Sequence, residues 1–160
     1  MQGTSGLRLV CFELRGQELA LQIGDVRETL PLQPITHLFL APAALAGVFS
    51  LRGEIVPALD LGILLGLPRT EVGTDSRIVV VETERGTAGI VVDRLRALRI
   101  LDTELEPPPA SLPPEVAVLL RGVTSTPTGT VRVLDVAAIL SAEPLRALAH
   151  AHASTDGEAA

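Results

Sequence analysis

The sequence is poor in aromatic residues and in positive charge. Its 160 residues include three phenylalanines, no tryptophan and no tyrosine, and 13 Lys and Arg stand against 19 Asp and Glu. Proteins that bind nucleic acid usually present a basic surface and aromatic rings on which bases stack. The net charge of −6 and the lack of such rings therefore argue against nucleic acid as a partner.

Cysteine and histidine are also scarce. Cys11 is the only cysteine, so no internal disulfide can form, which fits a reducing, cytoplasmic compartment. His150 and His152 stand two positions apart near the C-terminal end and form no metal-ligand set with His37 and Cys11. No phosphate-binding, dinucleotide-binding or hydrolase motif occurs. We expect no metal, no cofactor and no catalytic residue.

Long apolar runs are absent as well. Although 47% of the residues are apolar, Gly, Pro, Arg or Asp interrupts every run well before the roughly 20 residues that a membrane helix needs. The first residues lack the charged segment and apolar stretch of a signal peptide. The expectation is a soluble globular chain, with one domain or two intimate subdomains and no membrane insertion.

What the sequence does contain is an internal repeat. The run VPALDLGILL at 56–65 aligns without a gap with VRVLDVAAIL at 131–140, 75 positions later, and at the same offset Gly47-Val48 falls on Gly122-Val123. A second block relates Val26-Arg27 to Leu95-Arg96 at an offset of 69. Such self-similarity predicts two copies of one β-unit.

The patterns within each copy predict strands rather than long helices. A hairpin turn is expected at Gly16-Gln17, a loop at the proline-rich 107–114, and short helices that begin after capping residues Asp60 and Asp135. A short C-terminal helix is expected from Pro144, followed by a disordered tail at 153–160. The expected strands are 7–14, 19–23, 26–31, 47–51 and 54–59 in the first copy, and 77–84, 87–93, 94–100, 119–123 and 130–135 in the second.

Arg52 and Gly53 interrupt an otherwise apolar strand pair. At the offset of 75 they fall on Pro127 and Thr128, so the second copy makes the same connection without an arginine. Gly53 suits a two-residue hairpin turn that needs a positive φ. Arg52 is then either a solvated turn residue or a residue that contacts a partner.

Three spaced motifs resemble those of the CheW-like domain family. The run GVFSLRGEIVPALDL at 47–61 resembles its G-h-h-N-L-R-G-x-h-h-P-h-h-D-L signature, where h is apolar, with Ser50 in place of the usual Asn and Gly62 where an Arg commonly follows. The run 26–28, VRE, resembles the V-x-E element. The run 89–98, GIVVDRLRAL, resembles the G-h-h-V-D-x-h-x-x-h element. The resemblance extends from residue 7 to about 150.

This resemblance implies an all-β fold of two SH3-like five-stranded β-barrel subdomains with short capping helices and a C-terminal helix. Residues 1–152 would form the domain, with subdomains at roughly 15–66 and 77–140. The implied function is that of an adaptor, not an enzyme. It would couple the cytoplasmic signalling tips of chemoreceptors to the regulatory domain of the histidine kinase CheA, in receptor arrays at the inner membrane. At 160 residues we expect a stand-alone coupler without kinase modules.

The resemblance also implies a partner-binding surface. Arg52 matches the arginine of the family's L-R-G turn and Glu28 the glutamate of V-x-E, so the two are expected to form an ion pair at the rim of a groove, with Gly53 shaping the turn. Val26, Leu95 and Leu98 are the candidates for the apolar floor that receives a helix; the alternative is that they are barrel core.

Other functions remain open at this stage. A CheW-like adaptor could serve type IV pilus motility or surface sensing instead of swimming chemotaxis. A hydrolase using Asp60, Asp93 or Asp135 is disfavoured because no nucleophile and base accompany them. A small-ligand-binding barrel is a third alternative.

Overall fold

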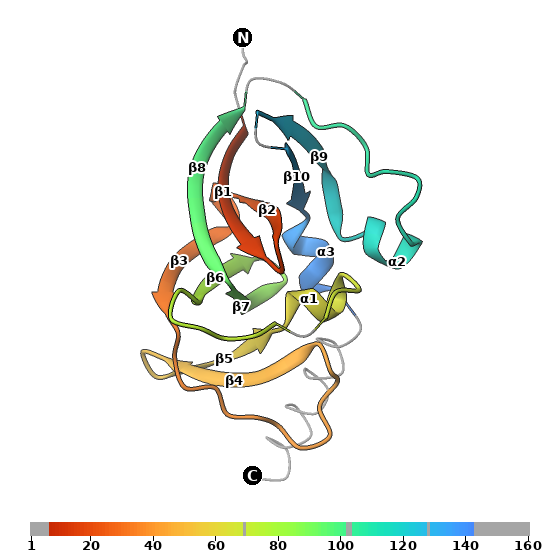
Figure 1. The fold of residues 1–160 in the computed structure, drawn as a ribbon. Coiled ribbons are helices and arrows are strands. Elements are labelled where there is room, and N and C mark those ends of the chain that lie inside the picture. Colours follow the sequence, from red (N-terminus) through yellow and green to blue (C-terminus); the bar gives the residue numbers. More distant parts are fainter. Residues whose placement is uncertain (1–6, 69, 102–103, 128, 143–160) are drawn as a thin grey trace.

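The computed structural model describes residues 7–68, 70–101, 104–127 and 129–142, which form strands with a few short helices (Figure 1). No helix within these residues is long and apolar enough to cross a membrane. The elements in chain order are β1 (Leu7–Leu14), β2 (Gln17–Gln22), the 3-10 helix η1 (Ile23–Asp25), β3 (Val26–Pro31), β4 (Leu45–Leu51), β5 (Glu54–Leu59), α1 (Leu61–Leu64), β6 (Arg77–Thr83), β7 (Gly86–Val92), β8 (Arg94–Leu101), α2 (Pro114–Ala117), β9 (Leu120–Thr126), β10 (Gly129–Leu134) and α3 (Val136–Leu140).

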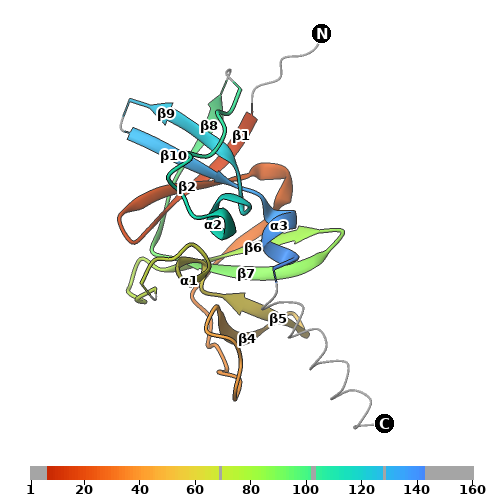
Figure 2. The same cartoon turned by 90° about the vertical axis from the view of Figure 1, so that its right-hand side faces the viewer.

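The strands form two five-stranded sheets. One has the order β8-β1-β2-β10-β9 and the other β3-β6-β7-β5-β4. Figure 1 shows the first sheet above the second, with α1 and α3 between them, and Figure 2 shows the same stacking from the side. The all-β class with two five-stranded units is confirmed.

The two sheets are not divided at the expected ranges 15–66 and 77–140. The hairpin β1–β2 at the start of the first copy joins the sheet built from the second copy, and β6–β7 joins the sheet built from the first. Each exchanged hairpin is paired with the other copy on both sides. The antiparallel pairings are β1 with β8 and β3 with β6, and the shorter parallel ones are β2 with β10, through Ala20 and Val133, and β5 with β7, through Ala58 and Gly89. The repeat does not reveal this exchange, because either hairpin has the apolar content to fill either sheet.

The repeat itself is reproduced in the register of the strands. In one sheet the β1–β8 pairing shifts between Cys11 and Phe12, which face Ala97 and Leu95. In the other, the β3–β6 pairing shifts at the positions 69 residues away, where Val80 faces Glu28 and Val81 faces Val26. The pairings β4–β5 and β9–β10 share an equivalent irregularity, at Leu45/Gly47 and at Leu120/Gly122. The two copies are therefore equivalent strand by strand, bulges included.

Each sheet is closed by the segment that follows its edge strand. After β3 the chain crosses to the opposite edge, where Thr36 and Val48 exchange backbone hydrogen bonds of 2.7 and 2.9 Å. After β8, Glu106 pairs in the same way with Val123 of β9, at 2.9 and 2.8 Å. Joining the two edges turns each sheet into a small barrel.

The core consists of three clusters of buried side chains. One cluster fills each barrel: Phe49, Leu51, Val56, Ala58, Ile78, Val80 and Val91 in one, and Leu9, Cys11, Ala20, Val131 and Val133 in the other. The largest lies between the barrels and includes residues of both exchanged hairpins, such as Phe12, Leu19, Val81 and Ile90. The exchanged hairpins are thus buried on both faces, which explains runs such as IVVV at 78–81.

Both predicted helix caps are present. The Asp60 carboxylate accepts the backbone N–H of Ile63 at 3.4 Å, and Asp135 accepts that of Ala138 at 3.0 Å. Asp60 also accepts the backbone N–H and the hydroxyl of Thr70, at 3.1 and 2.9 Å, and is 4% exposed. Asp60 therefore anchors a loop in addition to starting a helix.

Two local expectations are corrected. The first hairpin turns at Arg15-Gly16, not Gly16-Gln17, with positive φ values of 52° and 80° that suit a two-residue turn. The proline-rich segment ends in the short helix α2, which begins at Pro114 because proline is well suited to the first helical position. The expected C-terminal helix and the tail at 153–160 lie outside the described residues.

We predict unequal effects of removing the two caps. Asp135→Ala should lower the free energy of unfolding by about 1 kcal/mol, the usual value of an N-cap. Asp60→Ala should lower it by roughly 2 kcal/mol or more, because the half-buried N–H of Thr70 also loses its acceptor. Urea unfolding of the two variants measures both values, and equal values would mean that the Thr70 contacts contribute nothing.

Barrel closure predicts a steric requirement at Gly122. A Cβ atom there would lie 2.5 Å from the Glu106 carbonyl oxygen, within the pairing that closes the barrel. Gly122→Ala should destabilise the protein by about 1–3 kcal/mol through overpacking. Gly73→Ala is the matched control, since an added Cβ there meets nothing within 4 Å. Similar unfolding midpoints for the two variants would contradict the proposed role of the closure.

Candidate functional site

The Arg52-Gly53 turn projects from the end of the β4–β5 hairpin. Leu51 and Glu54 are the last paired residues, and the two turn residues have φ values of 48° and 86°. Positive φ at both positions defines the turn that best matches strand twist, and Gly53 supplies one of them at no steric cost. Arg52 adopts a conformation that is uncommon for a residue with a side chain.

Arg52 makes a two-pronged ion pair with Glu28. Its Nη1 and Nη2 atoms donate to Oε2 and Oε1 of Glu28 at 2.6 and 2.7 Å. The hydrogen bonds from Arg52 lower the pKa of Glu28, and the same contact raises that of Arg52. The Arg52 side chain is 64% exposed and that of Glu28 21%, so the arginine retains an accessible face. The expected ion pair is present.

The ion pair belongs to a larger charged network. Arg27 Nη1 lies 3.4 Å from Glu54 and 3.8 Å from Glu82, and Arg27 Nε lies 3.8 Å from Glu28. Glu28 lies on the edge strand β3 and Arg52 beside the opposite edge β4, so the pair spans the two edges of one sheet. Sequence reasoning missed Arg27, Glu54 and Glu82, because cross-strand neighbours follow only from the register.

The other barrel lacks the Arg52–Glu28 contact. Ala97 stands at the position of Glu28, and Pro127 at that of Arg52. One pair does recur, since Arg96 and Glu13, 3.4 Å apart, occupy the positions of Arg27 and Glu82. A barrel of this kind thus closes without the two-pronged pair.

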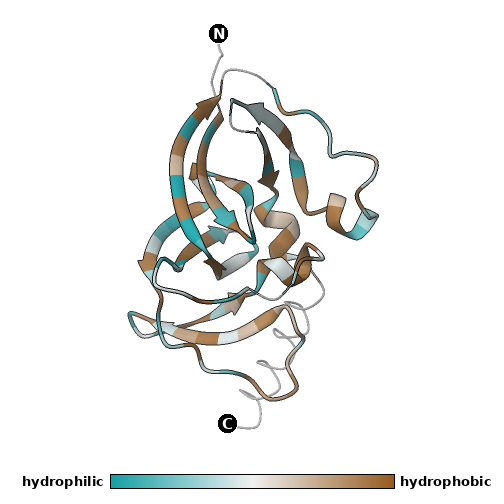
Figure 3. Ribbon diagram, viewed as in Figure 1, coloured by the Kyte–Doolittle hydropathy of each residue, from teal (hydrophilic) through white to brown (hydrophobic). Residues whose placement is uncertain are grey.

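The three apolar candidates differ in their surroundings. Val26 and Leu95 are half-buried, pack against the central cluster and occupy equivalent positions opposite Val81 and Phe12. Leu98 lies further along β8 and is 69% exposed, as is Ile100 at 68%. Val26 and Leu95 therefore contribute to the core, whereas Leu98 is a surface residue. Figure 3 shows apolar residues interspersed with polar ones along β8. This pattern could have identified Ile100 as a second exposed apolar residue of the strand.

The aspartates considered for hydrolysis all bond to nearby backbone. Asp60 and Asp135 cap helices, and Asp93 Oδ2 accepts the backbone N–H of Arg15 at 2.8 Å. Asp93 Oδ1 is buried and has no hydrogen-bond partner among the described residues. These contacts are structural and give the hydrolase alternative no support.

Cys11 is held in an unreactive state. It lies inside a barrel and is 1% exposed. Burial, with a smaller effect of Glu18, raises the pKa of its thiol to about 11. The thiol is therefore protonated at neutral pH, and the protonated form is a poor nucleophile.

The chain belongs to the CheW-like domain family, which it matches over residues 8–144. It is 27% identical over 148 residues to the chemotaxis protein CheW of Treponema pallidum, covering 89% of this chain and 87% of the relative. It is 24% identical over 140 residues to CheW of Bacillus subtilis, covering 87% and 90%. The scaffolding protein TtCheW of Thermoanaerobacter tengcongensis has the same fold, with a TM-score of 0.74 and 27% identity over 84% of this chain and 87% of that one. Proteins named for chemotaxis and for scaffolding are thus among the relatives of this chain.

The burial of Cys11 predicts slow thiol chemistry. At pH 8 an aromatic disulfide reagent should modify the folded protein orders of magnitude more slowly than the urea-unfolded protein, in which the thiol is exposed and titrates near its ordinary pKa. The absorbance of the released thiolate measures both rates. Equal rates would mean that the barrel opens as fast as the reagent reacts.

Proposed function

We propose that the protein couples the cytoplasmic signalling tips of chemoreceptors to a CheA-type histidine kinase, as a cytoplasmic chemotaxis scaffold. The observation that carries this proposal is the Arg52–Glu28 pair. It is held by two short hydrogen bonds, stands on an exposed turn, and is missing from the equivalent barrel. A feature that the fold does not require is best explained by a partner.

The receptor-binding surface would lie where β3 and β8 begin. Val26 and Leu95 mark the starts of these strands and occupy equivalent positions in the two barrels. The parts of Val26 and Leu95 that the core leaves exposed, together with the exposed Leu98, would offer apolar anchors to a helix with apolar residues at i, i+3, i+4 and i+7. Arg52 and Glu28 would fix the register of that helix, since charges at a rim contribute more to specificity than to affinity.

Loss of Arg52 should impair coupling and leave the fold intact. Arg52→Ala should change the midpoint of thermal unfolding by no more than about 2 °C, as expected of an exposed substitution. Binding of a receptor-tip fragment should weaken clearly. Glu28→Ala should weaken it too, and the double variant should be less than additive because the two residues act as a pair.

Arg85→Ala is the matched control, because Arg85 also precedes a glycine in a hairpin turn and is exposed. It should bind the receptor fragment as the wild type does. Gly53→Val should instead lower stability, since its φ of 86° disfavours a branched side chain. If Arg52→Ala recovers receptor fragment and kinase regulatory domain at wild-type levels, Arg52 is a solvated turn residue and this proposal loses its main support.

A further inference from the structure

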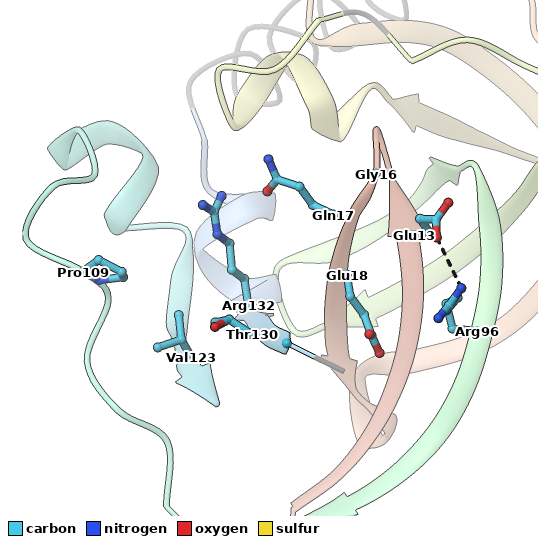
Figure 4. A pocket seen from close by; sticks show the side chains of 10 residues that line it. Glu13, Gly16, Gln17, Glu18, Arg96, Pro109, Val123, Thr130 and Arg132 are labelled. Atoms are coloured by element: carbon cyan, nitrogen blue, oxygen red, sulfur yellow. Dashed lines mark hydrogen bonds and ion pairs between the residues drawn. The ribbon is translucent and has the colours of Figure 1, made fainter. Parts of the chain in front are cut away.

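The barrel built from β8-β1-β2-β10-β9, the upper one in Figure 1, carries on its outer face a polar pocket of about 530 Å³. It lies between the turn of the β1–β2 hairpin, the strands β9 and β10, and the proline-rich segment that follows β8 (Figure 4). Figure 4 shows the Arg132 and Gln17 side chains extending toward the same end of the pocket, with Pro109 and Val123 on the facing wall. The pocket thus combines hydrogen-bond donors with an apolar side.

Most charges around the pocket are paired, but one is not. Glu13 lies 3.4 Å from Arg96 and 3.8 Å from Arg94, and Glu18 lies 3.2 Å from Arg99. Arg132 is half-buried and makes no hydrogen bond or ion pair within the described residues. An unpaired, partly desolvated guanidinium is unusual in a protein with a net charge of −6.

The internal repeat provides a control for what the fold requires. At the offset of 75, Arg132 corresponds to Pro57 and Thr130 to Ile55, which is 59% exposed. At these two positions the outer face of β5 is therefore apolar where that of β10 is polar. Since both barrels close with the same register, neither Arg132 nor Thr130 is needed for folding.

We propose that this pocket receives a single carboxylate, the Asp or Glu side chain of a partner-protein segment. The Arg132 guanidinium would hold it in a two-pronged contact, and the Thr130 hydroxyl and Gln17 amide would donate to it. An apolar side chain next to the carboxylate would pack on Pro109 and Val123. Because Glu13 and Glu18 line the same pocket, one negative charge matches Arg132, whereas a phosphate would be repelled. The identity of the partner rests on the proposed function, but the site itself does not.

The site is tested directly by NMR of the arginine Nε–Hε groups in the full chain. The probe is the peptide acetyl-Leu-Glu-Leu-amide, with acetyl-Leu-Gln-Leu-amide, sodium acetate and inorganic phosphate as comparisons at equal ionic strength. The Glu peptide should shift the Arg132 resonance saturably and the other probes at least about tenfold more weakly. No shift with the Glu peptide overturns the site, and equal shifts with acetate or phosphate overturn its assignment to a protein segment.

The partner is tested with Arg132→Ile, Arg132→Lys and the control Arg121→Ile, which removes an exposed arginine of the neighbouring strand β9. Arg132→Ile should weaken binding of the kinase regulatory domain or of the receptor fragment roughly tenfold and reduce its salt dependence. Arg132→Lys should recover part of the affinity, and Arg121→Ile should bind as the wild type does. Wild-type affinity of Arg132→Ile for both partners overturns a role in coupling. If the wild type binds neither partner, the proposed function fails and the peptide titration alone decides the site.

Discussion

Each exchanged hairpin, β1–β2 or β6–β7, is paired on both sides with strands of the other copy, and these pairings hold the architecture together. β2 pairs with β10 and β5 with β7 over two residue pairs each, and every other pairing between named strands is antiparallel. Through these contacts and the antiparallel β1–β8 and β3–β6 pairings, each barrel takes a hairpin from one sequence copy and its other three strands from the other. Neither copy can complete a barrel alone, so the two barrels are expected to fold as one unit.

The exchange also explains the composition of the central strands. Alternate residues of β1, β2, β6 and β7 point into a barrel and into the cluster between the barrels, so both faces must be apolar. Cys11 and Phe12 are one such pair of neighbours. Charged residues consequently concentrate on the outer strands and turns, where Arg52, Glu28 and Arg132 are found.

Local sequence patterns predicted the elements well, and distant pairings poorly. The strands, the caps at Asp60 and Asp135 and the Arg52–Glu28 contact followed from periodicity, cap chemistry and resemblance. The hairpin exchange did not, since a repeat states which segments are alike and not which copy they pair with. Arg27 and Glu82 were missed for a related reason, because a charge network across strands depends on register. The half-burial of Val26 and Leu95 depends on how the barrels pack, which no local pattern encodes.

Comparison of the two copies separates the requirements of folding from those of binding. Positions that agree between copies, such as Gly47 with Gly122 and Asp60 with Asp135, serve closure and capping and tolerate little change. Positions that differ between the copies are not required for closure or capping in at least one barrel. Arg52 against Pro127 and Arg132 against Pro57 are two such differences, one in each barrel, and each places an arginine on an outer surface. The proposed coupling requires that two partners be bound without confusing them, and a duplicated fold with one distinct charged feature on each copy would meet that requirement.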